Sequence, residues 1–153
     1  MKKEELKKDV VSFLQGHPLM VLATASAEGV PRANTVIFYV DDRLNFYFIT
    51  REGSQKVRNM DENDKVALSV SFDPPYNVEA VGAAERVTDK KTRELVMDKF
   101  VEHAVGLPDI WPPVFRYSDA DYVVFRIRPK SVRVLDLTSQ HIYQSEPPFT
   151  DLL

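Results

Sequence analysis

The fold is decided by residues 46–56, which read Phe46-Tyr47-Phe48-Ile49-Thr50-Arg51-Glu52-Gly53-Ser54-Gln55-Lys56. Residues 44–50 are rich in aromatic and branched side chains that alternate between two faces, which predicts a β-strand. A polar loop follows, and Ser54 is suited to cap a short helix that runs to about Met60. The segment is therefore expected to fold as strand, loop and helix.

The start of this short helix carries groups that can bind an anion. Backbone N–H groups at a helix start have no partner within the helix and attract phosphate, and the helix dipole adds to the attraction. Lys56 lies in the first turn and supplies a point charge, while Thr50 and Ser54 offer hydroxyl donors. The alternative is an ordinary strand–loop–helix with a surface lysine. Periodicity alone favours that alternative, because serine caps and exposed lysines are common.

On both sides of this segment the sequence predicts short strands interrupted by a few helices. Amphipathic helices are expected over residues 3–15 and 89–104. Gly82 is the expected site of a bulge. We find no internal repeat or linker, so residues 1–153 are expected to form one domain. The pattern predicts a mainly β protein, a small barrel with α-helices packed outside. The other expected strands cover residues 19–25, 33–40, 65–72, 78–87, 122–128 and 131–135.

The composition excludes several classes of function. The chain has no cysteine, which rules out disulfide scaffolds, thiolate zinc sites and cysteine nucleophiles. A formal net charge of -3 with scattered basic residues gives no case for nucleic-acid binding. No apolar stretch reaches the length of a membrane span, and residues 1–9 lack the apolar core of a signal peptide. We therefore expect a cytoplasmic protein that binds neither nucleic acid nor membrane.

Side chains that commonly carry catalysis or bind metals give little signal. None of His17, His103 and His141 stands at metal-ligand spacing from another, so no metal site is proposed. No serine lies in a recognisable nucleophile elbow.

The strand–loop–helix resembles the FMN-phosphate motif of the pyridoxamine 5′-phosphate oxidase family. In that family a strand with a terminal hydroxyl residue is followed by Gly-Ser-x-Lys, which here is Gly53-Ser54-Gln55-Lys56. Upstream, residues 21–38 are similar to the family's first hairpin. Downstream, Asn63-Asp64-Lys65-Val66-Ala67-Leu68 and residues 81–87 are similar to its next two strands. The resemblance covers roughly residues 19–87 with the expected order and spacing.

This resemblance implies a six-stranded antiparallel split β-barrel with Greek-key connections. It also implies a homodimer that binds FMN at the interface between its subunits. Thr50, Ser54 and Lys56 would hold the phosphate, and the strand from Arg32 to Phe38 would lie along the flavin. The cofactor-binding residues that the resemblance implies are Arg32, Asn34, Thr35, Val36, Ile49, Thr50, Ser54 and Lys56.

The chain departs from the family pattern at three places. The family has a phosphate-binding arginine on its second strand where this chain has Asn34. Arg32 lies two residues earlier on the same face, and it either takes over this contact or is a surface residue. Tyr39 stands where the true oxidases have a lysine that contacts pyridoxal phosphate. Their C-terminal Arg-x-His motif is absent from residues 131–153. The resemblance thus implies a retained FMN site without the vitamin-oxidase substrate site.

We therefore hypothesise an FMN-dependent oxidoreductase of this family that acts on a small-molecule redox substrate, with FMN carrying the redox chemistry. A non-catalytic FMN-binding protein or electron carrier is the alternative, which the lost substrate residues favour. A third hypothesis keeps the fold but exchanges FMN for a deazaflavin or another tetrapyrrole-sized ligand. Two roles are open for Trp111. It packs in the protein core or at a dimer interface, or it stacks on the flavin ring as a cover.

Overall fold

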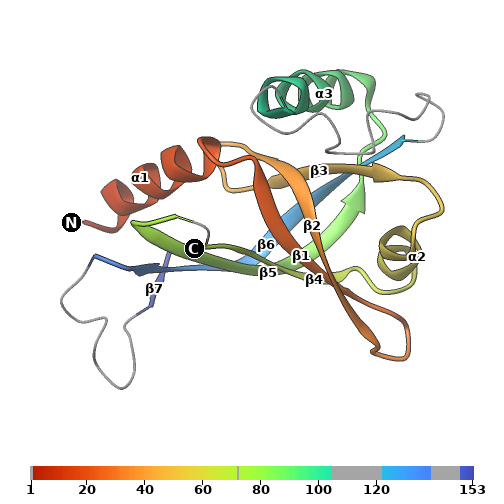
Figure 1. The fold of residues 1–153 in the computed structure, drawn as a ribbon, viewed down its shortest axis with the longest axis horizontal. Coiled ribbons are helices and arrows are strands. Elements are labelled where there is room, and N and C mark those ends of the chain that lie inside the picture. The colour runs from red at the N-terminus through yellow and green to blue at the C-terminus, as the bar shows by residue number, and fades with distance from the viewer. Residues whose placement is uncertain (1, 72, 105–121, 139–148) are drawn as a thin grey trace.

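The computed structural model describes residues 2–71, 73–104, 122–138 and 149–153 of the chain. The predicted helix over residues 3–15 and the predicted strand over residues 19–25 have the expected bounds, and most other elements begin or end within a few residues of expectation. In chain order (Figure 1), the elements are α1 (Lys3–Gln15), β1 (Leu19–Ala25), β2 (Pro31–Val40), β3 (Phe46–Arg51), α2 (Gln55–Glu62), β4 (Lys65–Val70), β5 (Tyr76–Arg86), α3 (Lys90–Ala104), β6 (Tyr122–Asp136) and β7 (Thr150–Asp151).

Six strands close into an antiparallel barrel. Their neighbour order is β3-β2-β1-β4-β5-β6, and β6 pairs back with β3 from Phe46–Ile127 to Arg51–Tyr122. The strands β1, β2 and β3 are consecutive neighbours, while β4 returns to lie beside β1, which is a Greek-key connection. The predicted six-stranded antiparallel barrel with helices outside is thus confirmed. The short strand β7 adds to β6 beyond the closed part.

Large aromatic side chains from neighbouring strands fill the barrel. Phe38, Phe46, Phe48 and Phe125 are all essentially inaccessible to solvent. The rings of Phe48 and Phe125 stack with centroids 5.6 Å apart, and the two residues are opposite each other in the β3–β6 ladder. Because aromatic side chains bury large apolar areas, this row supplies much of the driving force for closing β3 against β6.

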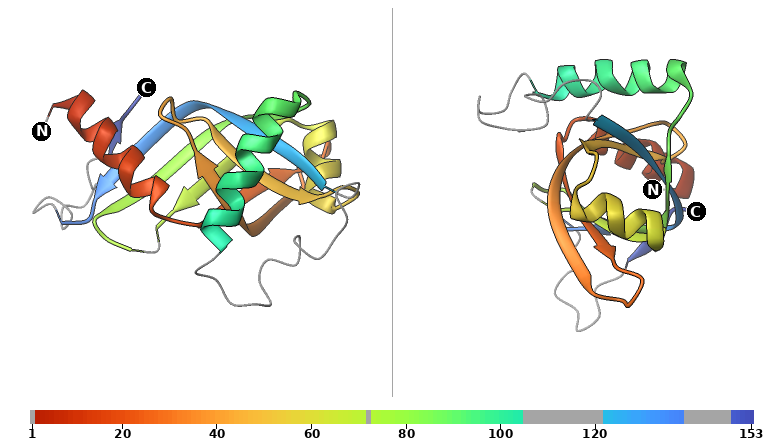
Figure 2. Two further views of the ribbon diagram at one scale, coloured as in Figure 1. Left: turned by 90° about the horizontal axis from the view of Figure 1, so that it is seen from above. Right: turned by 90° about the vertical axis from the view of Figure 1, so that its right-hand side faces the viewer.

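The helices occupy three separate places around the barrel. Figures 1 and 2 show α1 and α2 at opposite ends and α3 along one side. None of the described helices is long and apolar enough to cross a membrane. Each helix turns an apolar stripe towards the strands, as amphipathic helices do. The buried apolar side chains are Val10, Val11 and Leu14 of α1, Val57 and Met60 of α2, and Val96 and Phe100 of α3.

The hydrogen-bonded ladder between β5 and β6 contains one shift of register. Its register shifts between Val81 and Gly82, so the predicted bulge is confirmed. Gly82 lies opposite Pro129 while Val81 lies opposite Ser131, which leaves one extra residue in β6. The prediction of two separate strands in this region is wrong, because β6 runs on through Pro129. A bulge tolerates the missing N–H group of proline.

Candidate functional site

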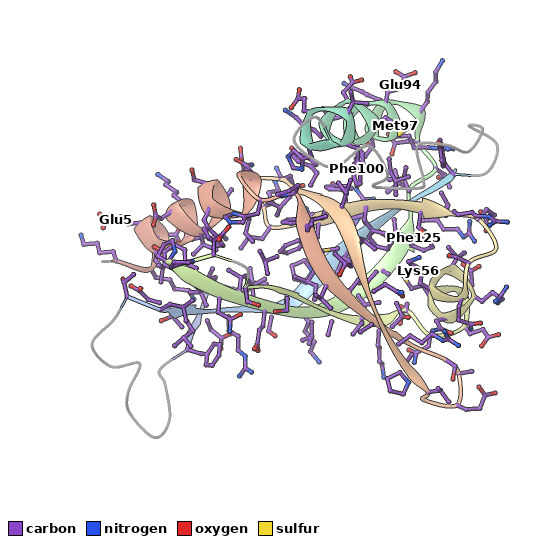
Figure 3. The ribbon with its side chains drawn as sticks, viewed as in Figure 1. Glu5, Lys56, Glu94, Met97, Phe100 and Phe125 are labelled. Carbon is purple, nitrogen blue, oxygen red and sulfur yellow. The ribbon has the colours of Figure 1, made fainter. Side chains whose placement is uncertain are left out.

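The predicted phosphate-binding residues lie in one continuous turn between β3 and α2. Thr50 is buried near the end of β3. The following loop turns at Gly53, whose φ of 80° lies in the region that favours glycine. Ser54 is the N-cap residue of α2, and Lys56 lies in the first turn of that helix (Figure 3). Local chain geometry therefore brings Ser54 and Lys56 to the same helix start, while Thr50 lies in the strand that leads into the turn.

The Ser54 side chain does not act as a helix cap. The residue has the extended backbone of an N-cap, but its hydroxyl makes no capping hydrogen bond. The Oγ atom is buried and has no hydrogen-bond partner among the described residues. A buried hydroxyl without a partner costs about 1–3 kcal/mol. This hydroxyl is therefore available to donate to a ligand oxygen at the start of α2.

Lys56 is a half-buried cation without an acidic neighbour. Burial lowers the pKa of its ammonium group, because desolvation disfavours the charged form. No ion pair or hydrogen bond reaches Lys56 from the described part of the chain. A hydroxyl, a cation and the first N–H groups of a helix thus meet at one place. These are groups that bind phosphate.

The strand β2 carries the other half of the predicted set. Its ladder with β3 ends at Phe38, and its first half pairs only with β1. No hydrogen bond or ion pair joins this half of β2 to the start of α2 within the residues described. The structure therefore assembles the helix-start residues but leaves the β2 residues on a separate hairpin. Of the remaining predicted residues, the exposed ones are Arg32, Asn34 and Thr35, and the buried ones are Val36 and Ile49.

Charged residues that no sequence pattern singled out make hydrogen bonds to this turn and to α2. Arg86, the last residue of β5, donates hydrogen bonds to Glu52 at 2.8 and 2.9 Å and to Asp61 at 2.8 and 3.0 Å. These hydrogen bonds lower the pKa of both carboxyl groups. Arg58 donates to the Gly53 carbonyl at 2.8 Å. Because Arg86 is 34 residues from Glu52, helical or strand periodicity cannot reveal the pair.

The other candidates from the sequence contribute little to the site. Nδ1 of His17 lies 2.6 Å from the backbone carbonyl oxygen of Phe13 in α1, and Nδ1 of His103 lies 2.8 Å from that of Phe38 in β2. The residues seen in the structure include no cluster of histidine, aspartate and glutamate that could hold a metal ion. Trp111 and His141 lie outside the described residues.

The barrel topology places this chain among the six-stranded antiparallel split-barrel proteins. The family model for pyridoxamine 5′-phosphate oxidase matches residues 6–136, and the chain therefore belongs to that family.

Among curated relatives, the pyridoxine/pyridoxamine 5′-phosphate oxidase of Vibrio vulnificus is 29% identical over 84 residues, which cover 54% of this chain and 40% of the relative. The corresponding enzyme of Crocosphaera subtropica is 39% identical over 70 residues, which cover 45% and 33% of the two chains. The matched segments thus span less than half the length of either relative.

Several solved structures share the fold. General stress protein 26 from Bacillus anthracis has a TM-score of 0.67 at 20% identity, and the match covers 97% of this chain and 99% of that one. An FAD-binding protein from Mesorhizobium loti has a TM-score of 0.64 at 22% identity, covering 82% and 89%. A heme binding protein from Mycobacterium smegmatis has a TM-score of 0.65 at 19% identity, covering 95% and 57%. At these identities the likeness shows the fold alone.

Proposed function

We propose that this chain is an FMN-dependent oxidoreductase that holds the cofactor phosphate with Thr50, Ser54 and Lys56. The observation that carries the proposal is the pair of unpartnered groups at the start of α2, a buried hydroxyl and a half-buried ammonium. A phosphate would give both groups a partner at once, and the first N–H groups of the helix would add to binding. Family membership and the FAD-binding structural neighbour support a flavin.

The rest of the cofactor would lie towards β2. Arg32, Asn34 and Thr35 offer exposed polar groups along one hairpin, while Val36 and Ile49 are buried. The isoalloxazine ring supplies the electron transfer when FMN is bound. The task of the protein is to bind the phosphate, orient the ring and keep water from it. A side-chain nucleophile is not required for this chemistry.

We infer that the substrate is not pyridoxamine 5′-phosphate. Tyr39 lies near the position where the resemblance places the lysine that contacts pyridoxal phosphate in the true oxidases. The Tyr39 ring stacks on Tyr47 with centroids 5.8 Å apart, and burial raises the pKa of its hydroxyl. An aromatic pair therefore stands where the vitamin oxidases have that lysine, and Lys99 Nζ lies 5.9 Å from the Tyr39 ring centroid. The same departure favours the second candidate function, a non-catalytic FMN-binding protein or electron carrier.

A heme in place of FMN accounts less well for the site. The heme binding protein from Mycobacterium smegmatis shows that this fold also occurs with heme. A buried hydroxyl beside an unpaired lysine fits an anionic group better than it fits a metal centre, since neither side chain is a usual ligand of heme iron. The phosphate of FMN is the anionic group that the proposal assigns to this place.

The purified protein is expected to bind FMN at least about tenfold more tightly than riboflavin, because only FMN offers charge-assisted hydrogen bonds to the helix start. Quenching of flavin fluorescence measures both dissociation constants. The two ligands share the same ring, so riboflavin controls for contacts to the isoalloxazine. Equal affinities would contradict the phosphate assignment.

We also propose that two copies of the chain share the flavin. Val81, in the middle of β5, is 47% exposed. A shallow groove of about 800 Å³ lies beside it on the outer surface of β1, β4, β5 and β6. Small apolar residues line much of this groove, including Ala67 and Ala83. An apolar sheet surface of this kind needs a cover, and a two-fold contact between copies is the simplest closed one.

Light scattering is expected to give the mass of two chains, with FMN released when the dimer is diluted into single chains. A binding site shared between subunits predicts this coupling, because each subunit alone would hold only part of the cofactor. A single-chain mass at micromolar concentration with FMN still bound would contradict a shared site.

A further inference from the structure

We propose that Arg86 is the positioning residue of the phosphate-binding turn, which it holds in shape and shields from two neighbouring carboxylates. This inference rests on the proposed function, because the turn matters only if it binds an anion. Arg86 stands at the end of β5, outside the segment that carries Thr50, Ser54 and Lys56.

The guanidinium group of Arg86 joins three parts of the fold. Nη1 and Nη2 donate to the two carboxylate oxygens of Glu52, in the loop before α2. Nε and the same Nη2 donate to the two carboxylate oxygens of Asp61, in the last turn of α2. Its central carbon lies 5.5 Å from the ring centroid of Phe125 in β6. Phe125 in turn stacks on Phe48 in the barrel core. Arg86 thus connects the loop before α2 and the last turn of α2 to Phe125 of the barrel core.

Apart from Arg86, the loop before α2 is held by the Arg58 hydrogen bond to the Gly53 carbonyl at 2.8 Å and by a backbone hydrogen bond from Ser54 to Arg51 at 3.3 Å. The helix α2 has only eight residues, and helices of this length are not stable by themselves. The buried contacts of α2 all lie after the helix start. They are the side chains of Val57 and Met60 and a hydrogen bond of 3.0 Å from Asn59 to Thr24. Glu52 comes before that start, so the Arg86–Glu52 pair acts on the loop that leads into Ser54. Fixing this loop fixes the direction of the first N–H groups and of the Ser54 hydroxyl.

The same contacts adjust the charge around the site. Residues 50–62 carry three acidic side chains (Glu52, Asp61, Glu62) and three basic ones (Arg51, Lys56, Arg58). Two of the acidic side chains, Glu52 and Asp61, are the partners of Arg86. Direct pairing with Arg86 offsets much of the repulsion that these carboxylates would exert on an anion. Exposed ion pairs generally contribute little to stability, and the Arg86 side chain is 36% exposed. The effect of Arg86 is therefore expected in ligand discrimination more than in overall stability.

The test compares Arg86→Met, Arg86→Lys and the double variant Arg86→Met with Glu52→Gln. The matched control is Arg133→Met, which removes an arginine–glutamate pair between β6 and Glu79 of β5, far along the strand from α2. Two quantities are measured for each: the dissociation constants of FMN and riboflavin, and amide hydrogen exchange over residues 52–62 in the ligand-free protein.

Arg86→Met is expected to weaken FMN binding about tenfold, to change riboflavin binding less than about twofold, and to speed exchange over residues 52–62. Arg86→Lys should restore only part of the affinity, because lysine cannot bind two carboxylates in bidentate fashion. Removing Glu52 as well should recover part of the loss by deleting the unpaired charge. Arg133→Met should leave both readouts unchanged.

Equal weakening of FMN and riboflavin, or unchanged exchange over residues 52–62, would overturn the proposal. The exchange measurement also separates this proposal from the proposed function. If the unaltered protein shows no preference for FMN, the phosphate assignment fails, and the role of Arg86 in holding the turn is still decided by exchange in the ligand-free chain.

Discussion

Lys56→Ala is expected to weaken FMN binding by about 1.5–3 kcal/mol, a factor of roughly 10 to 150 in the dissociation constant. Lys56 is the half-buried cation of the helix start and has no competing partner in the described part of the chain. Its whole electrostatic contribution is therefore available to the phosphate. Fluorescence titration with FMN measures the change, and riboflavin affinity should remain nearly constant.

The fold should survive this substitution. Burial already disfavours the charged form of Lys56, so its removal relieves a desolvation penalty, and the thermal unfolding temperature should stay the same or rise. Lys91→Ala is the matched control, because Lys91 is an exposed lysine in the first turn of α3. An unchanged dissociation constant for FMN in Lys56→Ala would show that this lysine belongs to the surface and not to a phosphate site.

Gly82→Ala is expected to lower the free energy of unfolding by about 3 kcal/mol, the upper end of the usual cost of overpacking. A Cβ atom at this position would lie 2.2 Å from the carbonyl oxygen of Arg128 and 2.7 Å from the Cα atom of Pro129. Both are backbone atoms within the β5–β6 ladder, so neither can move aside without disturbing the bulge. Urea unfolding at equilibrium measures the difference.

The control for this experiment is Gly16→Ala. Gly16 ends α1 with a φ of -85°, and a Cβ atom there would meet its nearest neighbour at an ordinary 3.5 Å. Alanine fits this conformation and should stabilise the protein by about 0.4–1 kcal/mol through the unfolded chain. Similar unfolding free energies for the two variants would mean that the strands at the bulge can separate at little cost.

The bounds of helices and strands that are defined by a local pattern of apolar residues could be predicted closely. The predicted bounds of α1 and β1 agree with the structure because a few apolar residues at a constant spacing define each element. The order of Thr50, Ser54 and Lys56 from the end of β3 to the start of α2 was predictable for a related reason. They belong to a single strand–loop–helix, so chain continuity alone brings them near one another.

Other features depend on strand pairing and packing between segments that are distant in the sequence, which a local residue pattern cannot predict. The prediction of two strands around Pro129 is wrong because a bulge allows β6 to continue. Ser54 lies at the predicted cap position, yet its hydroxyl makes no cap bond, which depends on the packing around the helix start. The segment from residue 136 to 153 showed no period, but Leu152 is buried and donates its N–H to Val132.

The order of strands and helices and the bulge at Gly82 could be inferred from residue types and their spacing. The phosphate-binding role proposed for Thr50, Ser54 and Lys56 came from the family resemblance and not from spacing alone. The hydrogen bonds of Arg86 to Glu52 and Asp61 could not be inferred in this way. The exposure of residues 31–35, the first half of β2, could not be inferred either. Arg86 meets Glu52 and Asp61 only because β5 pairs with β6, and β6 with β3, so that the end of β5 reaches α2 across the barrel. Such contacts follow from the register of distant strands, and register is decided by how the whole barrel closes.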